Sequence, residues 1–293
     1  MPAPPQPAAH RELGLAALSL LSTPPPQLVR EAAAAGFDSV GIRVRAVTAR
    51  EPVYDLSPGS PLLDQTLEAL QETGLRVHDV EFLLLDGTQQ REAWLRMLEA
   101  GQALDAKTLT VACADPDPER AARTMTRLVA DAEPHGIVPA IEPITYQSVR
   151  SLPSALEISR RSECGLVLDS LHLQRFGASE QEILACLDRT VTVQLCDAPR
   201  RSPEGREALI REARGGRLAP GDGELDLARL VRLIPPQIPL SLEAPAGTHE
   251  PARDDWAAHL HRRTCELLND SGVPTAQRAE TDDRPSTRIE HQD

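Results

Sequence analysis

The sequence repeats one pattern eight times, in which a short run of aliphatic and β-branched residues is followed by a longer segment with helical periodicity. Strands that alternate with helices in this way form a parallel sheet, and eight such units favour closure of the sheet into a barrel. The chain is therefore predicted to be a single α/β domain, a (β/α)8 TIM barrel. We expect its strands over residues 13–21, 39–44, 75–85, 108–113, 137–141, 165–168, 191–195 and 238–242.

Proline and glycine residues mark the expected helix boundaries. Thr23 stands before three prolines and is predicted to cap a helix whose first turn the prolines occupy. Gly36 and Gly74 follow helical segments, where a left-handed backbone ends a helix. The polar stretch between the seventh strand and Leu225 is expected to be a long loop.

The main rival fold, an open doubly wound sheet, is disfavoured because no G-x-G-x-x-G follows the first strand and G-x-x-x-x-G-K-[ST] is absent.

Composition predicts where the barrel begins and ends. Residues 1–10, rich in Pro and Ala, are expected to be a flexible N-terminal segment, and residues 11–269 the barrel. Residues 270–293 have little apolar periodicity and are expected to be a disordered tail. The start of the chain lacks the features of a secretory signal, and the five cysteines include no C-x-x-C pair. We therefore expect a reduced, cytoplasmic protein.

The charge balance limits the classes of partner. Lys and Arg number 31 against 44 Asp and Glu, so the formal net charge is −13. Such a surface repels phosphate backbones and anionic lipids, and no apolar stretch reaches the roughly 20 residues that a membrane span needs. Nucleic-acid and membrane partners are thereby excluded. A small-molecule substrate is expected, and the sequence leaves homo-oligomerisation open.

The fifth, sixth and eighth expected strands each end at an acidic residue: Glu142, Asp169 and Glu243 respectively. The carboxyl ends of barrel strands meet at the active-site face, so three carboxylates should converge there. Close carboxylates repel one another, which raises a pKa or requires a cation. Oxygen donors of this kind suit Mg²⁺ or Mn²⁺, with Co²⁺ and Zn²⁺ as further options. The sequence therefore predicts a site for one divalent metal ion.

Other side chains near these strand ends are candidates for the same site. Alternation along the seventh strand puts Gln194 on the face opposite Val193, where its amide oxygen could be a fourth ligand. His172, three residues after Asp169, is predicted to contact the substrate. Glu81, on the third strand, is interpreted either as an acceptor for a substrate hydroxyl or as a helix cap or support. Asp197 is expected to orient a loop arginine and not to touch the metal.

Several short motifs, in this order and spacing, resemble the xylose isomerase-like barrels, often labelled sugar phosphate isomerases/epimerases. The matching segments lie at residues 32–38, 141–143, 168–172, 193–198, 218–226 and 241–243. The resemblance implies one divalent metal held by Glu, Asp, His and Glu from strands five to eight, which here become Glu142, Asp169, Gln194 and Glu243. Gln194 departs from the more common His. A Gln ligand also occurs in a branch that resembles 3-dehydroshikimate dehydratases.

Three functions follow as hypotheses. The first is a metal-dependent isomerase or epimerase of a keto-sugar or cyclic polyol, in which Glu142 and Glu243 move a proton through a metal-stabilised enediolate while His172 binds a hydroxyl. The second is a dehydratase, in which His172 protonates a leaving hydroxyl. The third is a non-catalytic binding barrel, against which the retained acids count.

Arginines could bind a substrate carboxylate in the dehydratase hypothesis, because a guanidinium forms a bidentate pair with a carboxylate. Arg43 and Arg45 stand at the end of the second strand, and Arg214 and Arg217 in the polar stretch after the seventh. Solvent-exposed charges on loops are an equally good interpretation of the first pair.

Overall fold

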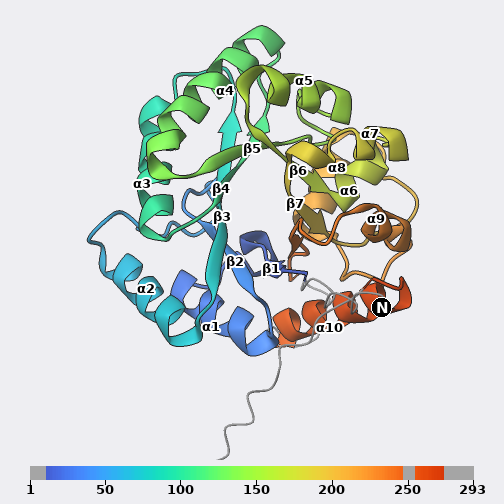
Figure 1. The fold of residues 1–293 in the computed structure, drawn as a ribbon, viewed down its shortest axis with the longest axis horizontal. Helices are drawn as coiled ribbons and strands as arrows, with labels where there is room; N and C mark the ends of the chain where they lie inside the picture. Colours follow the sequence, from blue (N-terminus) through green and yellow to red (C-terminus); the bar gives the residue numbers. More distant parts are fainter. Residues whose placement is uncertain (1–10, 247–254, 274–293) are drawn as a thin grey trace, which may run out of the picture.

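Eight parallel strands close into one barrel in the computed structural model, which describes residues 11–246 and 255–273. Each strand pairs with its neighbours in sequence, and the first pairs with the last. Figure 1 shows the strands at the centre of the molecule. The predicted (β/α)8 barrel is confirmed. The strands are β1 (Leu13–Leu15), β2 (Ser39–Arg43), β3 (Arg76–Leu85), β4 (Thr108–Cys113), β5 (Val138–Glu142), β6 (Gly165–Asp169), β7 (Thr190–Leu195) and β8 (Leu240–Leu242).

The helices form a ring around the barrel (Figure 1). They are α1 (Pro25–Ala35), α2 (Pro61–Thr73), α3 (Arg91–Ala103), α4 (Pro118–Ala132), α5 (Leu152–Ser162), α6 (Ser170–Arg175), α7 (Glu180–Leu184), α8 (Arg206–Gly215), α9 (Leu227–Leu233) and α10 (Trp256–Asp270), with 3-10 turns at Ala17–Leu20, Glu133–His135 and Leu187–Arg189. Aliphatic side chains fill the space between helices and strands, and Phe37, Leu98 and Met125 are fully buried there. No helix in the described part of the chain is long and apolar enough to cross a membrane.

Helix ends follow the sequence signals, with one exception. Gly36 ends α1 with φ 94°, and Gly74 ends α2 with φ 68°. The predicted cap at Thr23 is wrong, because the N-cap of α1 is Pro24 and no side chain caps that helix. A residue that precedes a proline is pushed out of the helical region, so Pro24 stays extended and the helix begins at Pro25.

Two expected elements differ in extent. The first strand ends at Leu15, not at residue 21, because the chain turns into a 3-10 helix where the Ala17 amide donates to Glu81 Oε1. The polar stretch after β7 is not all loop, since it contains α8. Ala213 is the single buried residue of α8, so the helix has too narrow an apolar face to be recognised from the sequence.

The predicted terminal segments lie largely outside the described residues. Residues 1–10 and 274–293 are not described. Within the described part, α10 ends at Asp270 and Val273 packs against the core.

Gly41 in β2 allows a close approach of two acidic side chains. A Cβ atom at this position would lie 2.7 Å from Asp79 Oδ1 and 3.1 Å from Glu81 Oε1. We expect Gly41→Ala to lower the free energy of unfolding by about 1–3 kcal/mol, as overpacking of a filled interior does. Urea unfolding measures the loss. Gly215→Ala is the control, because a Cβ there meets no atom within 4 Å; equal stability of both variants would contradict the prediction.

Candidate active site

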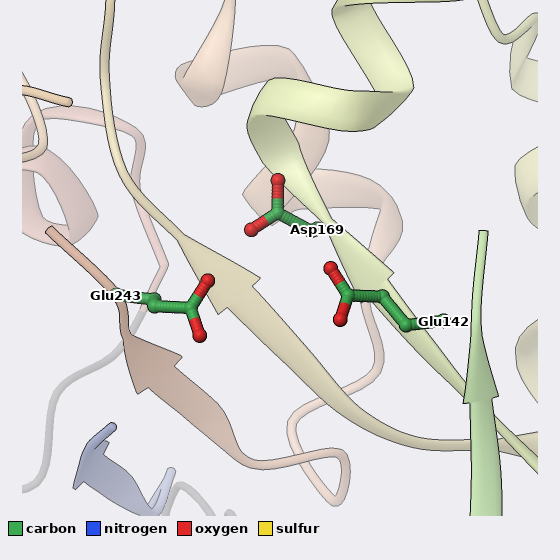
Figure 2. Close-up of side chains that lie close together, drawn as sticks. All are labelled: Glu142, Asp169 and Glu243. Carbon is green, nitrogen blue, oxygen red and sulfur yellow. The ribbon is translucent and has the colours of Figure 1, made fainter. Parts of the chain in front are cut away.

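Three carboxylates converge at the carboxyl ends of the strands. Glu142 is the last residue of β5, Asp169 is the last of β6, and Glu243 follows β8 directly. One carboxylate oxygen from each lies within 4.8 Å of the others, and their exposed fractions are 3%, 1% and 6%. Figure 2 shows Glu142 and Glu243 pointing toward one another, with Asp169 beside them. We call these three residues the acid triad.

Gln194 joins the acid triad from β7. It pairs in register with Asp169 on β6 and with Ser241 on β8, so its side chain lies between those of two triad strands. Its Nε2 donates a hydrogen bond to Glu243 Oε1 at 3.0 Å. Its Oε1 is buried and accepts no hydrogen bond. A buried amide oxygen without a hydrogen-bond partner lowers stability, so this oxygen is available as a ligand for a cation.

Arg217 supplies positive charge to the acid triad. Its Nη1 lies 2.5 Å from Asp169 Oδ2, and its Nη2 lies 3.0 Å from Glu243 Oε2. Its Nε donates to the Ala213 carbonyl oxygen at 2.8 Å, and the side chain is 2% exposed. The sequence offers Arg217 as a candidate anchor for a substrate carboxylate. The structure instead pairs its guanidinium with the acids, because buried carboxylates attract the nearest available cation.

The protonation of the acid triad follows from burial and from Arg217. Burial opposes ionisation of Asp169, but Arg217, His172 and a backbone N–H hold the pKa of this carboxyl below its ordinary value. Burial, together with the charges of Glu243 and Asp169, raises the pKa of Glu142 well above the ordinary value. Burial raises the pKa of Glu243 to about 8, although Arg217 opposes the shift. The Glu243 carboxyl therefore retains its proton near neutral pH, and burial shifts the pKa of Glu142 in the same direction.

The donor set fits a divalent cation. Arg217 offsets one of the three carboxylate charges, and two negative charges are left when Glu142 and Glu243 ionise. A divalent ion would replace two protons and use the free Gln194 oxygen. Carboxylate and amide oxygens are hard ligands, which suit Mg²⁺ or Mn²⁺.

His172 lies beside the acid triad as a buried, neutral imidazole. Its Nδ1 is 2.9 Å from Thr145 Oγ1, and its Nε2 is 3.8 Å from Glu142 Oε1. The Tyr146 ring packs edge-on against it, with the centroids 5.7 Å apart. Burial lowers the pKa of His172 to about 4, so the ring is uncharged at neutral pH. A nearby divalent cation would lower this pKa further.

A cavity of about 1190 Å³ opens above the acid triad. Its lining includes Glu142, Glu243 and His172, and the predicted substrate-binding residues Arg43 and Arg214. This volume is large enough to enclose a small organic substrate.

Glu81 does not line this cavity, so the structure favours the second interpretation, that of a supporting residue. Its Oε1 accepts from the Ala17 amide at 3.1 Å, and its Oε2 lies 3.0 Å from Arg43 Nη2. The Arg43 guanidinium lies over the Phe82 ring, 5.6 Å from its centroid. Glu81 therefore holds Arg43 in the cavity wall.

Asp197 holds the loop that carries Arg217. Its backbone pairs with Leu218, and its carboxylate accepts from the Gly221 and Leu225 amides at 3.0 and 2.9 Å. Among the described residues, no arginine side chain pairs with Asp197, so its expected role in orienting a loop arginine stays a prediction. The sequence contains one indication of the role of Arg217. Three acids that are predicted to converge carry excess negative charge, and this excess requires a cation from outside the strands.

Comparisons with known proteins place the chain among similar barrels. The sequence family described as xylose isomerase-like TIM barrel matches residues 29–267. No curated protein matches the chain significantly in sequence.

Solved structures resemble this fold over most of the chain. A xylose isomerase-like TIM barrel/4-hydroxyphenylpyruvate dioxygenase fusion protein is 22% identical with a TM-score of 0.75, over 91% of this chain and 45% of that longer one. The chain thus spans less than half the length of this fusion protein. D-allulose 3-epimerase from Methylomonas sp. is 17% identical, with a TM-score of 0.65 over 89% of this chain and 97% of that one. The probable 3-DHS dehydratase AsbF from Bacillus anthracis is 11% identical, with a TM-score of 0.68 over 87% and 98%. At these identities the likeness concerns the fold.

In the metal-free protein we expect stability to fall as pH rises from about 5 to about 8. The folded state keeps the Glu243 proton up to a pKa of about 8, whereas the unfolded chain releases it near the ordinary 4.5, so a rising pH favours unfolding. Glu243→Gln removes this contribution and should flatten the dependence. Urea unfolding with a chelator at pH 5.5 and 7.5 measures it, with the exposed Glu204→Gln as control. If the free energy of unfolding of Glu243→Gln fell with pH as steeply as that of the unmodified protein, the raised pKa of Glu243 would be contradicted.

Proposed function

The chain belongs to the xylose isomerase-like TIM barrel family, and from this premise we propose that it is a metal-dependent isomerase or epimerase. Its substrate would be a keto-sugar or cyclic polyol, and the reaction would pass through an enediolate. The observation that carries the proposal is the pair of buried glutamates, Glu142 and Glu243, which face each other across one point (Figure 2). An epimerisation needs a proton to leave one face of a carbon and another to arrive on the opposite face, and two opposed carboxylates supply both groups.

The acid triad and Gln194 would hold the divalent ion. When bound, the ion would supply positive charge for the oxyanion that forms as the α-proton leaves. Asp169 is suited to the ligand role alone, because Arg217 keeps it ionised. The free oxygen of Gln194 adds a neutral ligand, which leaves the charge of the site balanced.

The chain's own residues provide the proton transfers. Glu142 and Glu243 would exchange the roles of base and acid according to the direction of the reaction. The neutral His172 is suited to a hydrogen bond with a substrate hydroxyl, since Thr145 fixes its Nδ1 and its Nε2 lies on the Glu142 side. The guanidinium of Arg217, held between Asp169 and Glu243, fixes both carboxylates in position.

A dehydratase is the second candidate, because a Gln ligand resembles the dehydratase branch of the family. The same α-proton removal would then expel a β-hydroxyl, which must be protonated as it leaves. His172 is the nearest candidate acid, but a pKa of about 4 leaves it almost entirely unprotonated at neutral pH. In the dehydratase, the protonated Glu243 carboxyl would then supply this proton in place of His172. A binding barrel is disfavoured because burying three carboxylates without a chemical role only lowers stability.

The metal site predicts a clear response to loss of one ligand. Purified protein should contain one divalent ion per chain, and Asp169→Ala should contain none, because it removes the ligand whose pKa is held below its ordinary value. Elemental analysis after gel filtration measures the ratio, and circular dichroism verifies the fold. Asp188→Ala, a change of an exposed acid outside the site, is the control. Full metal content in Asp169→Ala would exclude the site.

The chemistry predicts that the two glutamates are both needed. Glu142→Gln and Glu243→Gln should keep the fold and slow the reaction by about 10²–10⁴-fold, since the amide cannot transfer the proton. Incorporation of solvent deuterium at the carbon next to the carbonyl, followed by NMR over a panel of keto-sugars and cyclic ketones, is the measurement.

The products of that panel separate the two candidates. Deuterium incorporation with no loss of water supports the isomerase or epimerase, whereas a rise in ultraviolet absorbance from a conjugated product identifies the dehydratase. Normal exchange rates in both glutamate variants would contradict the two-carboxylate mechanism.

A further inference from the structure

The cavity above the acid triad is larger than a keto-sugar requires. Its volume is about 1190 Å³, whereas pockets for drug-sized ligands usually measure about 300–1,000 Å³. A monosaccharide or a cyclitol is smaller than such a ligand. The part of the cavity away from the acid triad therefore has room for a second chemical group of the substrate.

The side of the cavity away from the acid triad is built by the first three strands. β2 stands opposite β6 in the closed barrel, with β1 and β3 as its neighbours (Figure 1). Leu18 and Leu21 come shortly after β1, whereas Phe82 and Leu84 belong to β3. All four side chains line the cavity and are partly exposed. We call these four residues the apolar wall.

The length of β3 explains why Phe82 and Leu84 are open to the cavity. β2 pairs with β3 only as far as Glu81, whereas β4 pairs with it as far as Leu85. The last four residues of β3 therefore extend past β2 at the mouth of the barrel. Leu83 and Leu85 are buried, so the alternation of a strand puts Phe82 and Leu84 on the other, open face.

Aromatic residues are scarce in this chain but surround the cavity. The chain has three Phe, two Tyr and two Trp residues, and one of each lines the cavity: Phe82, Tyr146 and Trp256. Trp256 Nε1 donates to the Ala244 carbonyl oxygen at 2.8 Å, so the one polar atom of this side chain is already used. Ligand pockets are lined mainly by aliphatic and aromatic side chains, which contact the apolar parts of a ligand. The position of these rings therefore indicates a ligand with an apolar part.

The polar groups next to the apolar wall are paired with one another. Arg43 Nη2 lies 3.0 Å from Glu81 Oε2, and its Nη1 lies 3.8 Å from Glu51 Oε2. Glu51 also accepts hydrogen bonds from the Val47 amide at 3.0 Å and from Thr48 Oγ1 at 3.1 Å. The hydroxyl groups of a second sugar would meet few free partners among the described residues here, and burial without partners costs free energy. This side of the cavity is better suited to a hydrocarbon surface.

We infer that the substrate is a keto-sugar or cyclic ketone with an apolar substituent, such as the aglycone of an alkyl or aryl glycoside. The apolar wall binds this substituent while the reacting carbon lies at the acid triad. The inference rests on the proposed function, because it names the class of substrate that the same site accepts. Burial of one CH₂ group strengthens binding about fourfold, so a substituent of a few carbons distinguishes this substrate from a free sugar.

Binding of glycosides that share one sugar tests the inference. Isothermal titration calorimetry of the full chain with Mn²⁺ would compare methyl, butyl and phenyl β-D-glucopyranoside with cellobiose. We expect the butyl and phenyl glycosides to bind about 10- to 60-fold more tightly than the methyl glycoside, with a more negative heat-capacity change from apolar burial. Equal affinity of the three glycosides, or tightest binding of cellobiose, would overturn the inference.

Variants of the apolar wall then locate the substituent. Leu84→Ala and Leu21→Ala, which lie on different elements, should each lower the ratio of phenyl to methyl glycoside affinity by about 3- to 10-fold, because each removes apolar contact area. Leu67→Ala is the matched control, because Leu67 is a 38% exposed leucine of α2 outside the cavity. Circular dichroism verifies the fold of each variant. A ratio that is unchanged in both wall variants would overturn the role of the apolar wall.

The outcome is separable from that of the proposed function. Equal affinity of the methyl, butyl and phenyl glycosides, together with deuterium exchange on free keto-sugars, would overturn the inference and leave the isomerase or epimerase intact. A preference for the phenyl glycoside that depends on Leu84, with no exchange on any ketone, would refute the proposed chemistry and support the apolar subsite.

Discussion

The repulsion among three buried carboxylates is the constraint on which the rest of the site depends. Glu142, Asp169 and Glu243 lie within reach of one another away from water, and a site of this kind is stable only with added positive charge. Arg217 provides part of it, and several features outside the strands serve to bring it there. Arg217 Nε donates a hydrogen bond to the Ala213 carbonyl oxygen of α8, and Asp197 fixes the loop that follows Arg217. The barrel strands carry the three acids, and the segment after β7 carries the positive charge that offsets part of their negative charge.

The barrel and the convergence of the acids could be predicted because both depend on local periodicity. Alternation of strands and helices gives the architecture, and a residue at the end of a parallel strand must lie at the active-site face. The pairing of Arg43 with Glu81 and of Arg217 with Asp169 could not be predicted. Long side chains on loops and strand ends can reach many partners, and the partner chosen depends on burial in three dimensions. The helix α8 was missed for a related reason, since its single buried residue leaves no apolar stripe to recognise.

One framework of residues is compatible with two reactions, and small features separate them. Removal of an α-proton between two glutamates is common to epimerisation and dehydration. The difference lies in which group would protonate a leaving hydroxyl, and burial makes His172 a poorer acid than the Glu243 carboxyl near neutral pH.

The guanidinium between Asp169 and Glu243 also bears on the order of assembly of the protein. Because Arg217 acts as a counter-ion built into the chain, and burial raises the pKa of both Glu142 and Glu243, the barrel can reach its folded form before any ion arrives. Loading would then be an exchange of protons for an ion at a finished site, not a step in chain folding. Under the proposed metal dependence, the identity of the bound ion would reflect the supply present after synthesis as much as the preference of the ligands.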